Sequence, residues 1–373
     1  MRMRIGLVVT GGVDASGRER VVPALLWLIE RLARRHDVHV FALHYHPEAR
    51  SYPLLGATVH DLGRVEGPPG LRRLRVRSRL RRAVARVGSL DLLHAYWGMP
   101  AILATRVGRG LGVPVVITLD SGELVSLDDL AYGLQRRLID RRAIARAIRH
   151  AARITVATGY MARMPALEGA RVDVVPIGVD TRRFPPSPAV DGPPWRLLRV
   201  ASINPVKDYA TLLRAFAAVV SHLPDVHLDI VGADTMDGAA QGLSRALGVE
   251  THVTFHGFQP TDAVAVFYAR AHLHVLSSRH EAASVATLEA ASAGVPTVGT
   301  AVGYVADWAP HDRAVAVAVG DHQALASAIG DLLRDDARRR RIAAAARAWT
   351  IEHDADWTAA RFQKIYAELE RQK

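Results

Sequence analysis

Short apolar segments alternate with helical segments along the whole chain of 373 residues. Strands that are apolar at nearly every position must be buried on both faces, which is typical of parallel sheets covered by helices on each side. The alternation therefore predicts an α/β fold with doubly wound, Rossmann-like sheets. We expect helices that include residues 18–35 and 99–111, and strands at 5–9, 38–43, 91–94, 115–119, 154–157, 172–175, 197–201, 228–231, 253–255, 273–276, 297–299 and 314–319.

The alternation is interrupted over residues 181–195, where five prolines and almost no periodicity predict a linker. This linker separates an N-terminal domain, 1–180, from a C-terminal domain, 196–350, and each is long enough to bury a core. The tail from residue 335 is expected to be helical throughout, with a last helix over 351–373 that packs back on the first domain. Ligands of open parallel sheets bind beyond the carboxyl ends of the strands, so both domains are expected to offer loops to a cleft between them.

The net charge of +11 lies entirely in the first half of the chain, where residues 1–180 hold 28 arginines against 16 acidic residues. Five arginines recur at spacings of three and four, which places them on one stripe of a helix: Arg72, Arg75, Arg79, Arg82 and Arg86. This stripe is either a surface attracted to an anionic membrane or an ordinary solvated face. Nucleic acid is the weaker interpretation, because aromatic residues do not interleave with the arginines.

The chain contains no cysteine, which excludes disulfides and cysteine-ligated metals. The first apolar run is too short for a signal peptide, and no run approaches the ~20 residues of a membrane span. The histidines lack metal-ligand spacing, so no metal is expected. We expect a soluble protein of the cytoplasm, at the inner face of the membrane if the arginine stripe binds lipid.

Two glutamates stand in the segment HEAASVATLEAASAGVPTVG, where seven residues separate Glu281 from Glu289. A glutamate ahead of a helix and another inside it can both face one site. Carboxylates accept hydrogen bonds from hydroxyls, and a helix N-terminus attracts anions. The pattern therefore suits a ligand with hydroxyls at one end and a phosphate in the middle. On spacing alone, two surface glutamates flanking an alanine-rich helix explain it equally well.

Lys207 is the second signal, because the chain has 45 arginines and only three lysines. It lies in the loop after an expected strand, while the other two lysines lie in the final helix. A lysine ammonium is a compact point charge suited to a diphosphate. An exposed loop lysine without a function is the alternative.

Three weaker features occur in the first half. Gly11 and Gly12 follow the first strand, where the backbone could approach an anionic group closely, although a simple turn explains them as well. His94 is expected at the end of a strand, either touching substrate or serving a structural role. Asp14, close after the two glycines, is a further candidate on this side.

In order along the chain, these features resemble the retaining glycosyltransferases of family 4, which have the GT-B fold of two facing Rossmann-like domains. The resemblance rests on Gly11-Gly12, PIGVDTRRF at 176–184, the Lys207 loop, HGF at 256–258, and E-x7-E followed by GVPTV. It runs along essentially the whole chain.

The resemblance implies a role for each matching residue. Glu281 would hold hydroxyls of the donor sugar, and Glu289 the ribose of its nucleotide. Lys207 would neutralise the leaving diphosphate. The implied donor-binding set is Gly11, Gly12, Ser202, Lys207, Phe258, Glu281, Ala283, Ser284, Val285 and Glu289.

The chain departs from the family at several of these positions. Ser202 stands where an arginine usually precedes the lysine by five residues, so a phosphate-balancing cation is missing unless an arginine such as Arg279 replaces it. Ala282-Ala283-Ser284 replaces Gly-Phe-Gly, and Gly303-Tyr304 replaces Gly-Gly. Asp120 occupies the place of a histidine near the reacting carbon, where it could orient or deprotonate an acceptor hydroxyl.

The predicted function is transfer of a sugar, with retention, from a nucleotide diphosphate to an acceptor hydroxyl on a saccharide or a lipid-linked acceptor. UDP or GDP is the expected nucleotide, and no cofactor is expected. Catalysis is assigned to Glu281, Lys207 and Asp120, and the acceptor-side candidates are Asp14, His94 and Asp120. Two alternatives stay open: a sugar-nucleotide epimerase with the same fold, and a non-catalytic scaffold that binds a membrane or polyanion.

Overall fold

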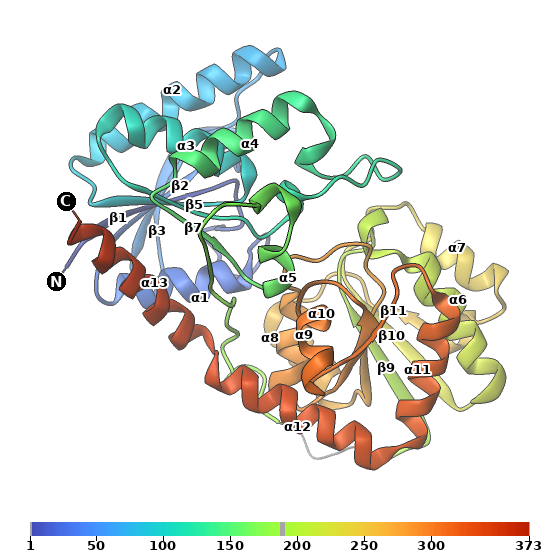
Figure 1. The fold of residues 1–373 in the computed structure, drawn as a ribbon. Coiled ribbons are helices and arrows are strands. Elements are labelled where there is room, and N and C mark those ends of the chain that lie inside the picture. The colour runs from blue at the N-terminus through green and yellow to red at the C-terminus, as the bar shows by residue number, and fades with distance from the viewer. Residues whose placement is uncertain (1, 187–190, 373) are drawn as a thin grey trace. The chain divides into compact units, whose positions relative to one another are not determined.

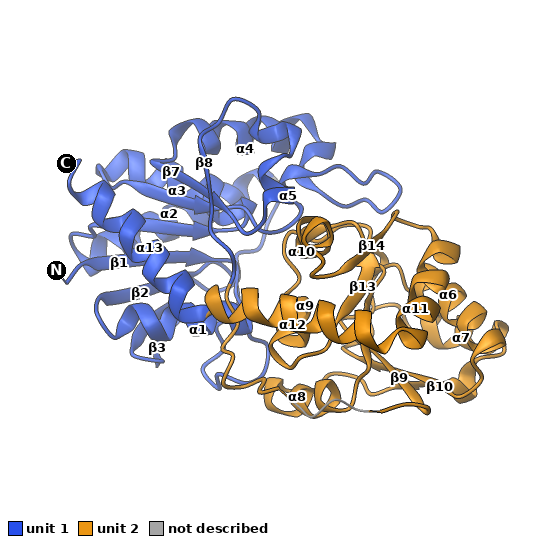
Figure 2. Ribbon diagram, turned by 60° about the horizontal axis from the view of Figure 1, so that its bottom comes forward, with its two compact units in different colours: residues 1–177, 355–373 blue, residues 178–354 orange. Residues whose placement is uncertain are grey.

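The computed structural model describes residues 2–186 and 191–372, which form two compact units (Figures 1 and 2). Unit 1 comprises Met1–Ile177 together with Ala355–Lys373, and unit 2 comprises Gly178–Asp354. The segment expected as a linker belongs to unit 2, and its residues 187–190 lie outside the described residues. Two α/β units of this kind confirm the predicted fold class.

Unit 1 contains an eight-stranded sheet in the order β3-β4-β2-β1-β5-β6-β7-β8. Its strands are parallel except for the antiparallel pair β3 and β4. Its inner strands are apolar and buried, as the sequence predicts. The strands are β1 (Arg4–Val9), β2 (Asp37–Ala42), β3 (Arg50–Leu54), β4 (Ala57–Asp61), β5 (Leu92–Tyr96), β6 (Val115–Thr118), β7 (Arg153–Val156) and β8 (Val172–Val174).

The helices of unit 1 connect these strands: α1 (Pro23–Ala33), α2 (Pro69–Val87), α3 (Gly98–Leu111), α4 (Leu138–His150) and α5 (Gly159–Ala162). The arginine-rich segment is α2, and its buried side chains are those of Val76, Leu80 and Val84. The last helix, α13 (Ala355–Glu370), belongs to unit 1 and lies beside α1 (Figure 2). The predicted return of the C-terminal helix to the first domain is therefore confirmed.

Unit 2 contains a six-stranded parallel sheet in the order β11-β10-β9-β12-β13-β14. Its strands are β9 (Trp195–Val200), β10 (Val226–Val231), β11 (Val253–Phe255), β12 (Leu273–Leu276), β13 (Thr297–Thr300) and β14 (Val315–Val317). Its helices are α6 (Tyr209–His222), α7 (Ala239–Ala246), α8 (Thr261–Ala269), α9 (Val285–Ser292), α10 (Gly303–Trp308), α11 (His322–Arg334) and α12 (Asp336–Glu352).

Each sheet has a point at which the strand order reverses. In unit 1 the reversal lies between β1 and β5, and in unit 2 it lies between β9 and β12. The connections leave the two central strands in opposite directions, which opens a crevice at their carboxyl ends where ligands of such sheets bind. The loops after these four strands are therefore the places to look for function.

Three sequence expectations need correction. Helix α1 begins at Pro23 instead of residue 18, because proline is well suited to the first helical turn. The tail is broken at His353 and Asp354 between α12 and α13. The β3–β4 hairpin, absent from the prediction, is a polar edge pair without the apolar signature of buried strands.

Within the described residues, no helix is both long and apolar enough to cross a membrane.

Candidate functional site

Lys207 lies at the switch point of unit 2, which is the place between β9 and β12 where the strand order reverses. Hydrogen bonds hold its backbone in position there. It ends a single 3-10 turn after β9, and the side chain of Asn204 accepts hydrogen bonds from the amides of Val206 and Lys207. The loop after β12 is joined to this turn, since Ser277 Oγ donates to the Lys207 carbonyl at 2.8 Å. The backbone that carries the lysine is therefore tied to the loop that carries the first glutamate.

Glu281 is the centre of a four-residue polar cluster. Lys207 Nζ lies 2.6 Å from Glu281 Oε1, and Ser278 Oγ donates to the same oxygen at 2.7 Å. Arg199, on β9 and only 1% exposed, donates from Nη2 to Ser278 Oγ at 2.8 Å. We call Arg199, Lys207, Ser278 and Glu281 the donor-side cluster. It brings together residues as far apart as 199 and 281 in the sequence.

The donor-side cluster keeps Glu281 ionised. Burial alone raises the pKa of its carboxyl, but the charges of Lys207 and Arg199 and the hydrogen bonds from Lys207 and Ser278 outweigh burial and bring the pKa below its ordinary value. A buried anion is stable only when it is paired in this way. The result is a fixed carboxylate beside a fixed ammonium.

Glu289 lies in α9 and is in a different electrostatic state. Its Oε2 accepts from the hydroxyl of Tyr268 at 3.1 Å, and within the described part of the chain no lysine or arginine donates to it. Burial raises its pKa to about 7. This carboxyl can therefore accept or donate hydrogen bonds near neutral pH.

The loop between Glu281 and Glu289 packs closely against the backbone at Gly303. Ser284 adopts a positive φ of 76° directly before α9, and the first amides of α9 have no acceptor within the helix. Gly303 also has a positive φ, and a Cβ there would lie 2.9 Å from the Ala283 carbonyl and 3.1 Å from Glu281 Cβ. Glycine at 303 is thus required to let this loop pack.

Two further donor-side predictions have defined surroundings. Ser202 Oγ accepts from Asn204 Nδ2 at 2.8 Å, so it supports the turn and supplies no charge. Phe258 is 56% exposed in the loop after β11. Its ring is thus accessible for stacking. The role of each donor-binding residue stays a prediction.

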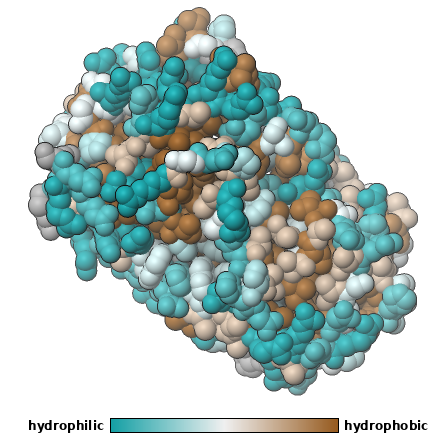
Figure 3. Space-filling model, in the orientation of Figure 1, coloured by the Kyte–Doolittle hydropathy of each residue, from teal (hydrophilic) through white to brown (hydrophobic). Residues whose placement is uncertain are grey.

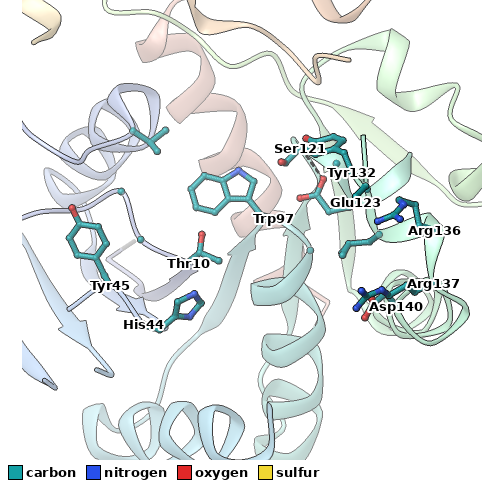
Figure 4. A pocket seen from close by; sticks show the side chains of 18 of the residues that line it. Thr10, His44, Tyr45, Trp97, Ser121, Glu123, Tyr132, Arg136, Arg137 and Asp140 are labelled. Atoms are coloured by element: carbon teal, nitrogen blue, oxygen red, sulfur yellow. Dashed lines mark hydrogen bonds between the residues drawn. The ribbon is translucent and has the colours of Figure 1, made fainter. Parts of the chain in front are cut away.

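Unit 1 has a pocket of about 930 Å³ at its own switch point (Figure 4). Thr10, Gly11 and Gly12 after β1 and Trp97 after β5 line one part of it, and Glu123 lines another. Figure 4 shows Glu123 beside Ser121, whose amide donates to Glu123 Oε2 at 2.8 Å. The predicted Gly11 and Gly12 therefore lie at a cavity and not at a plain turn.

The rim of this pocket is cationic. Arg20, Arg64, Arg136 and Arg137 all line it. Arg136 pairs with Asp128, and Arg20 lies over the ring of Tyr45 at 4.5 Å. Among the described residues, Arg64 and Arg137 take part in no ion pair. A concave site with this charge favours an anionic ligand.

Glu123 is the buried acid of the pocket, with 2% exposure. Burial raises its pKa to about 7. Its Oε1 has no hydrogen-bond partner within the part of the chain that the structure describes. Gly98 allows the close approach, since a Cβ there would lie 2.7 Å from Glu123 Cγ. The pocket therefore holds a buried carboxyl poised near neutrality, one oxygen of which has no partner among the described residues.

Replacing Glu123 with glutamine is expected to remove part of the pH dependence of stability. Between about pH 4.5 and pH 7 the folded chain retains the Glu123 proton that the unfolded chain has released. The free energy of unfolding therefore falls as pH rises through this window, by on the order of 1 kcal/mol per pH unit for one such group. Urea unfolding across this range should show wild type losing stability relative to Glu123→Gln. A pH-independent difference would contradict the raised pKa.

Two of the predicted acceptor-side residues, Asp120 and Asp14, do not line the pocket of unit 1. Asp120 Oδ1 accepts from the Ala157 amide at 2.7 Å, and burial raises the pKa of its carboxyl to about 8. Asp120 does not line the pocket, whereas Glu123 does. Asp14 caps a local turn through the Ser16 amide and is also outside the lining. The acceptor-side roles of Asp120 and Asp14 stay predictions.

His94 does not end a strand as predicted, and of the two roles considered for it the structure favours the structural one. It lies within β5 and is fully buried. Its Nδ1 lies 2.6 Å from the Tyr366 hydroxyl on α13, and its Nε2 lies 2.6 Å from Thr118 Oγ1. Burial lowers its pKa to about 3, so the ring stays neutral. His94 is thus a structural residue that links β5 to the C-terminal helix.

Two family models match the two units of the chain. Residues 180–349 match the family described as "Glycosyl transferases group 1", and residues 21–178 match the "Glycosyl transferase 4-like domain". A 2-deoxystreptamine N-acetyl-D-glucosaminyltransferase from Streptomyces fradiae is 30% identical over 280 residues, which cover 69% of this chain and 69% of that protein. The chain belongs to the family 4 glycosyltransferases. The recognised resemblance is confirmed.

Other members of the glycosyltransferase family show the same relation. A D-inositol 3-phosphate glycosyltransferase from Segniliparus rotundus is 29% identical over 278 residues, covering 67% of this chain and 62% of that protein. The chain thus spans less than two thirds of this relative. A sucrose-phosphate synthase from Thermosynechococcus elongatus superposes with a TM-score of 0.82 at 20% identity over 100% of both chains, which shows the shared fold. These matches do not favour the epimerase or scaffold alternatives.

Proposed function

We propose that this chain transfers a sugar, with retention of configuration, from a nucleotide diphosphate donor to an acceptor hydroxyl. The observation that carries the proposal is the Lys207–Glu281 pair, 2.6 Å apart at the switch point of unit 2. A fixed cation for a diphosphate stands there beside a fixed anion for hydroxyls, next to the N-terminus of α9. A nucleotide sugar presents these two groups side by side.

Each donor-side group has a part in the proposed reaction. Glu281 accepts hydrogen bonds from sugar hydroxyls, and Glu289 from the ribose. Phe258 stacks on the base. The amides at Ala283–Val285 bind the diphosphate, and Gly11 and Gly12 let the backbone of unit 1 approach an anion.

In the proposed chemistry, the bond between the anomeric carbon and the diphosphate oxygen breaks. The acceptor oxygen bonds to the same face of that carbon, and the proton of the acceptor hydroxyl passes to the departing diphosphate oxygen. Negative charge grows on the departing diphosphate, and Lys207 stabilises it through an ammonium that Glu281 already holds in place. No metal ion is assigned a part, because Lys207 and the amides of α9 supply the positive charge.

The acceptor is proposed to be anionic and to bind in the pocket of unit 1. The four arginines of its rim suit a phosphate, and Glu123 suits the reacting hydroxyl. The name of the Segniliparus relative, a D-inositol 3-phosphate glycosyltransferase, is in line with a phosphorylated acceptor. A saccharide or a lipid-linked acceptor with a phosphate meets the same requirement, and a membrane contact of unit 1 is proposed with it.

The test is an assay for release of nucleoside diphosphate from UDP-, GDP- and ADP-sugars, with phosphorylated polyols and sugars as acceptors. One donor should give acceptor-dependent release. Glu289→Gln should raise the KM for that donor, because a ribose contact is weakened. Absence of release with every donor and acceptor in the panel would count against the proposal.

A further inference from the structure

A second hollow of unit 1 lies away from its switch point, between α2 and α4 with α3 at its floor. It has a volume of about 1090 Å³. Ile102 and Leu103 of α3 and Ile148 of α4 are buried in its floor. Figure 3 shows apolar surface interrupted by hydrophilic side chains on the face that carries these helices. We call this hollow the α2–α4 groove.

The edge of the α2–α4 groove exposes large apolar side chains. Leu74 of α2 is 51% exposed, and Leu138 and Ile139 at the start of α4 are 49% and 67% exposed. Leu71, one turn before Leu74, is 52% exposed. Single exposed apolar residues are ordinary, but three at one groove, with Leu71 close by on α2, form a patch that marks an interaction surface.

The same groove carries an excess of positive charge. Six arginines line it, against the single acid Glu168: Arg73, Arg77, Arg106, Arg142, Arg146 and Arg149. Arg73 pairs with Asp140 at 2.8 Å. Within the described residues, the other five form no ion pair, and all five are exposed. Their charge is therefore available to a partner.

We propose that the α2–α4 groove docks unit 1 onto an anionic lipid surface. Arginines would contact the headgroups, and Leu74, Leu138 and Ile139 would enter the interface between headgroups and acyl chains. An acidic peptide could satisfy the charges, but exposed leucine and isoleucine side chains beside them favour a partner with an apolar interior. The occupant is thus a bilayer with anionic lipid.

This surface differs from the arginine stripe predicted on α2. Arg79 of that stripe donates to the carbonyls of Leu62, Gly63 and Arg64, and Arg75 donates to that of Glu66. These two arginines therefore fasten α2 to its own preceding loop. The α2–α4 groove instead combines the opposite edge of α2 with α4, which the sequence prediction did not include.

The groove adjoins the candidate acceptor pocket. Arg137 and Asp140 line the pocket, while Leu138 and Ile139, between them in sequence, line the groove. A bilayer at the groove would thus meet the mouth of the pocket, which suits an acceptor carried by a lipid. This consequence rests on the proposed function, but the docking itself does not.

Sedimentation with lipid vesicles tests the docking. The full chain should bind phosphatidylcholine vesicles that contain phosphatidylglycerol and should not bind phosphatidylcholine alone. Replacing Arg142, Arg146 and Arg149 with glutamine should weaken binding roughly 100-fold, at about 1 kcal/mol for each arginine. Leu138→Ser with Ile139→Ser should weaken the binding that persists at high salt.

The matched control is the triple variant Arg72→Gln, Arg82→Gln and Arg86→Gln on the predicted stripe. It loses the same charge and should bind vesicles nearly as wild type does. Equal loss in both triple variants would mean a diffuse charge effect and would overturn the proposal, as would failure of wild type to bind phosphatidylglycerol. Circular dichroism checks folding, and activity on a soluble acceptor reports separately on the proposed function.

Discussion

Replacing Lys207 with alanine is expected to lower the turnover of sugar transfer ~10²–10³-fold, the usual cost of removing one group that stabilises a developing anion. Its Nζ is the one lysine ammonium in unit 2, since Lys364 and Lys373 both lie in unit 1. Burial of Glu281 without this partner also raises the pKa of its carboxyl. The turnover should therefore fall most steeply at acidic pH, and steady-state kinetics across pH measures it.

Lys364→Ala is the matched control for this prediction. Lys364 is exposed on α13, and the same substitution there should leave turnover unchanged. If the Lys207→Ala variant is folded and its turnover is within a few-fold of wild type, Lys207 has no part in the proposed site.

Arg199→Met is expected to lower turnover roughly tenfold to a hundredfold. Arg199 donates a hydrogen bond to Ser278, and Ser278 donates one to Glu281. A hydrogen bond that involves a charged group contributes about 1.5–3 kcal/mol, which corresponds to this loss of turnover. Without the guanidinium, Ser278 is free to turn and Glu281 loses its second cation. In this chain Ser202 stands at the position where the family usually has an arginine. The change Ser202→Arg in the Arg199→Met background should therefore supply a second cation and restore part of the turnover.

Arg339→Met separates this effect from general destabilisation. Arg339 is the other buried arginine of unit 2, 7% exposed, and binds Asp336 and the carbonyls of Leu332 and Leu333, away from the donor-side cluster. Its replacement should lower the urea midpoint without lowering turnover. If both variants lost turnover only in proportion to their stability, Arg199 would have no positioning role.

The fold class could be predicted because its central strands are mostly apolar and alternate with helical segments along the chain. The polar β3–β4 pair carried no such signal. Sequence patterns also located Lys207, Glu281 and Glu289, through a rare residue type and a spacing. They could not show that Lys207 and Glu281 touch, because a contact across 74 residues depends on how strands β9 and β12 are ordered.

Other site residues carried no pattern that a sequence could reveal. Arg199 is hidden among 45 arginines, and only its burial in β9 distinguishes it. Glu123 is a single acid in a loop, and its role in the pocket depends on Gly98 and on β6. His94 was ambiguous because the partner of its ring, Tyr366, lies 272 residues later.

The configuration of the first product tests the central claim most directly. In the nucleotide-sugar assay, proton NMR reports the anomeric configuration of the new glycoside and any change in the donor sugar. With an α-linked donor, retaining transfer predicts an α-linked product and an equal amount of nucleoside diphosphate, both requiring Glu281 and Lys207. A β-linked product, or an epimerised donor formed without acceptor, would contradict the account.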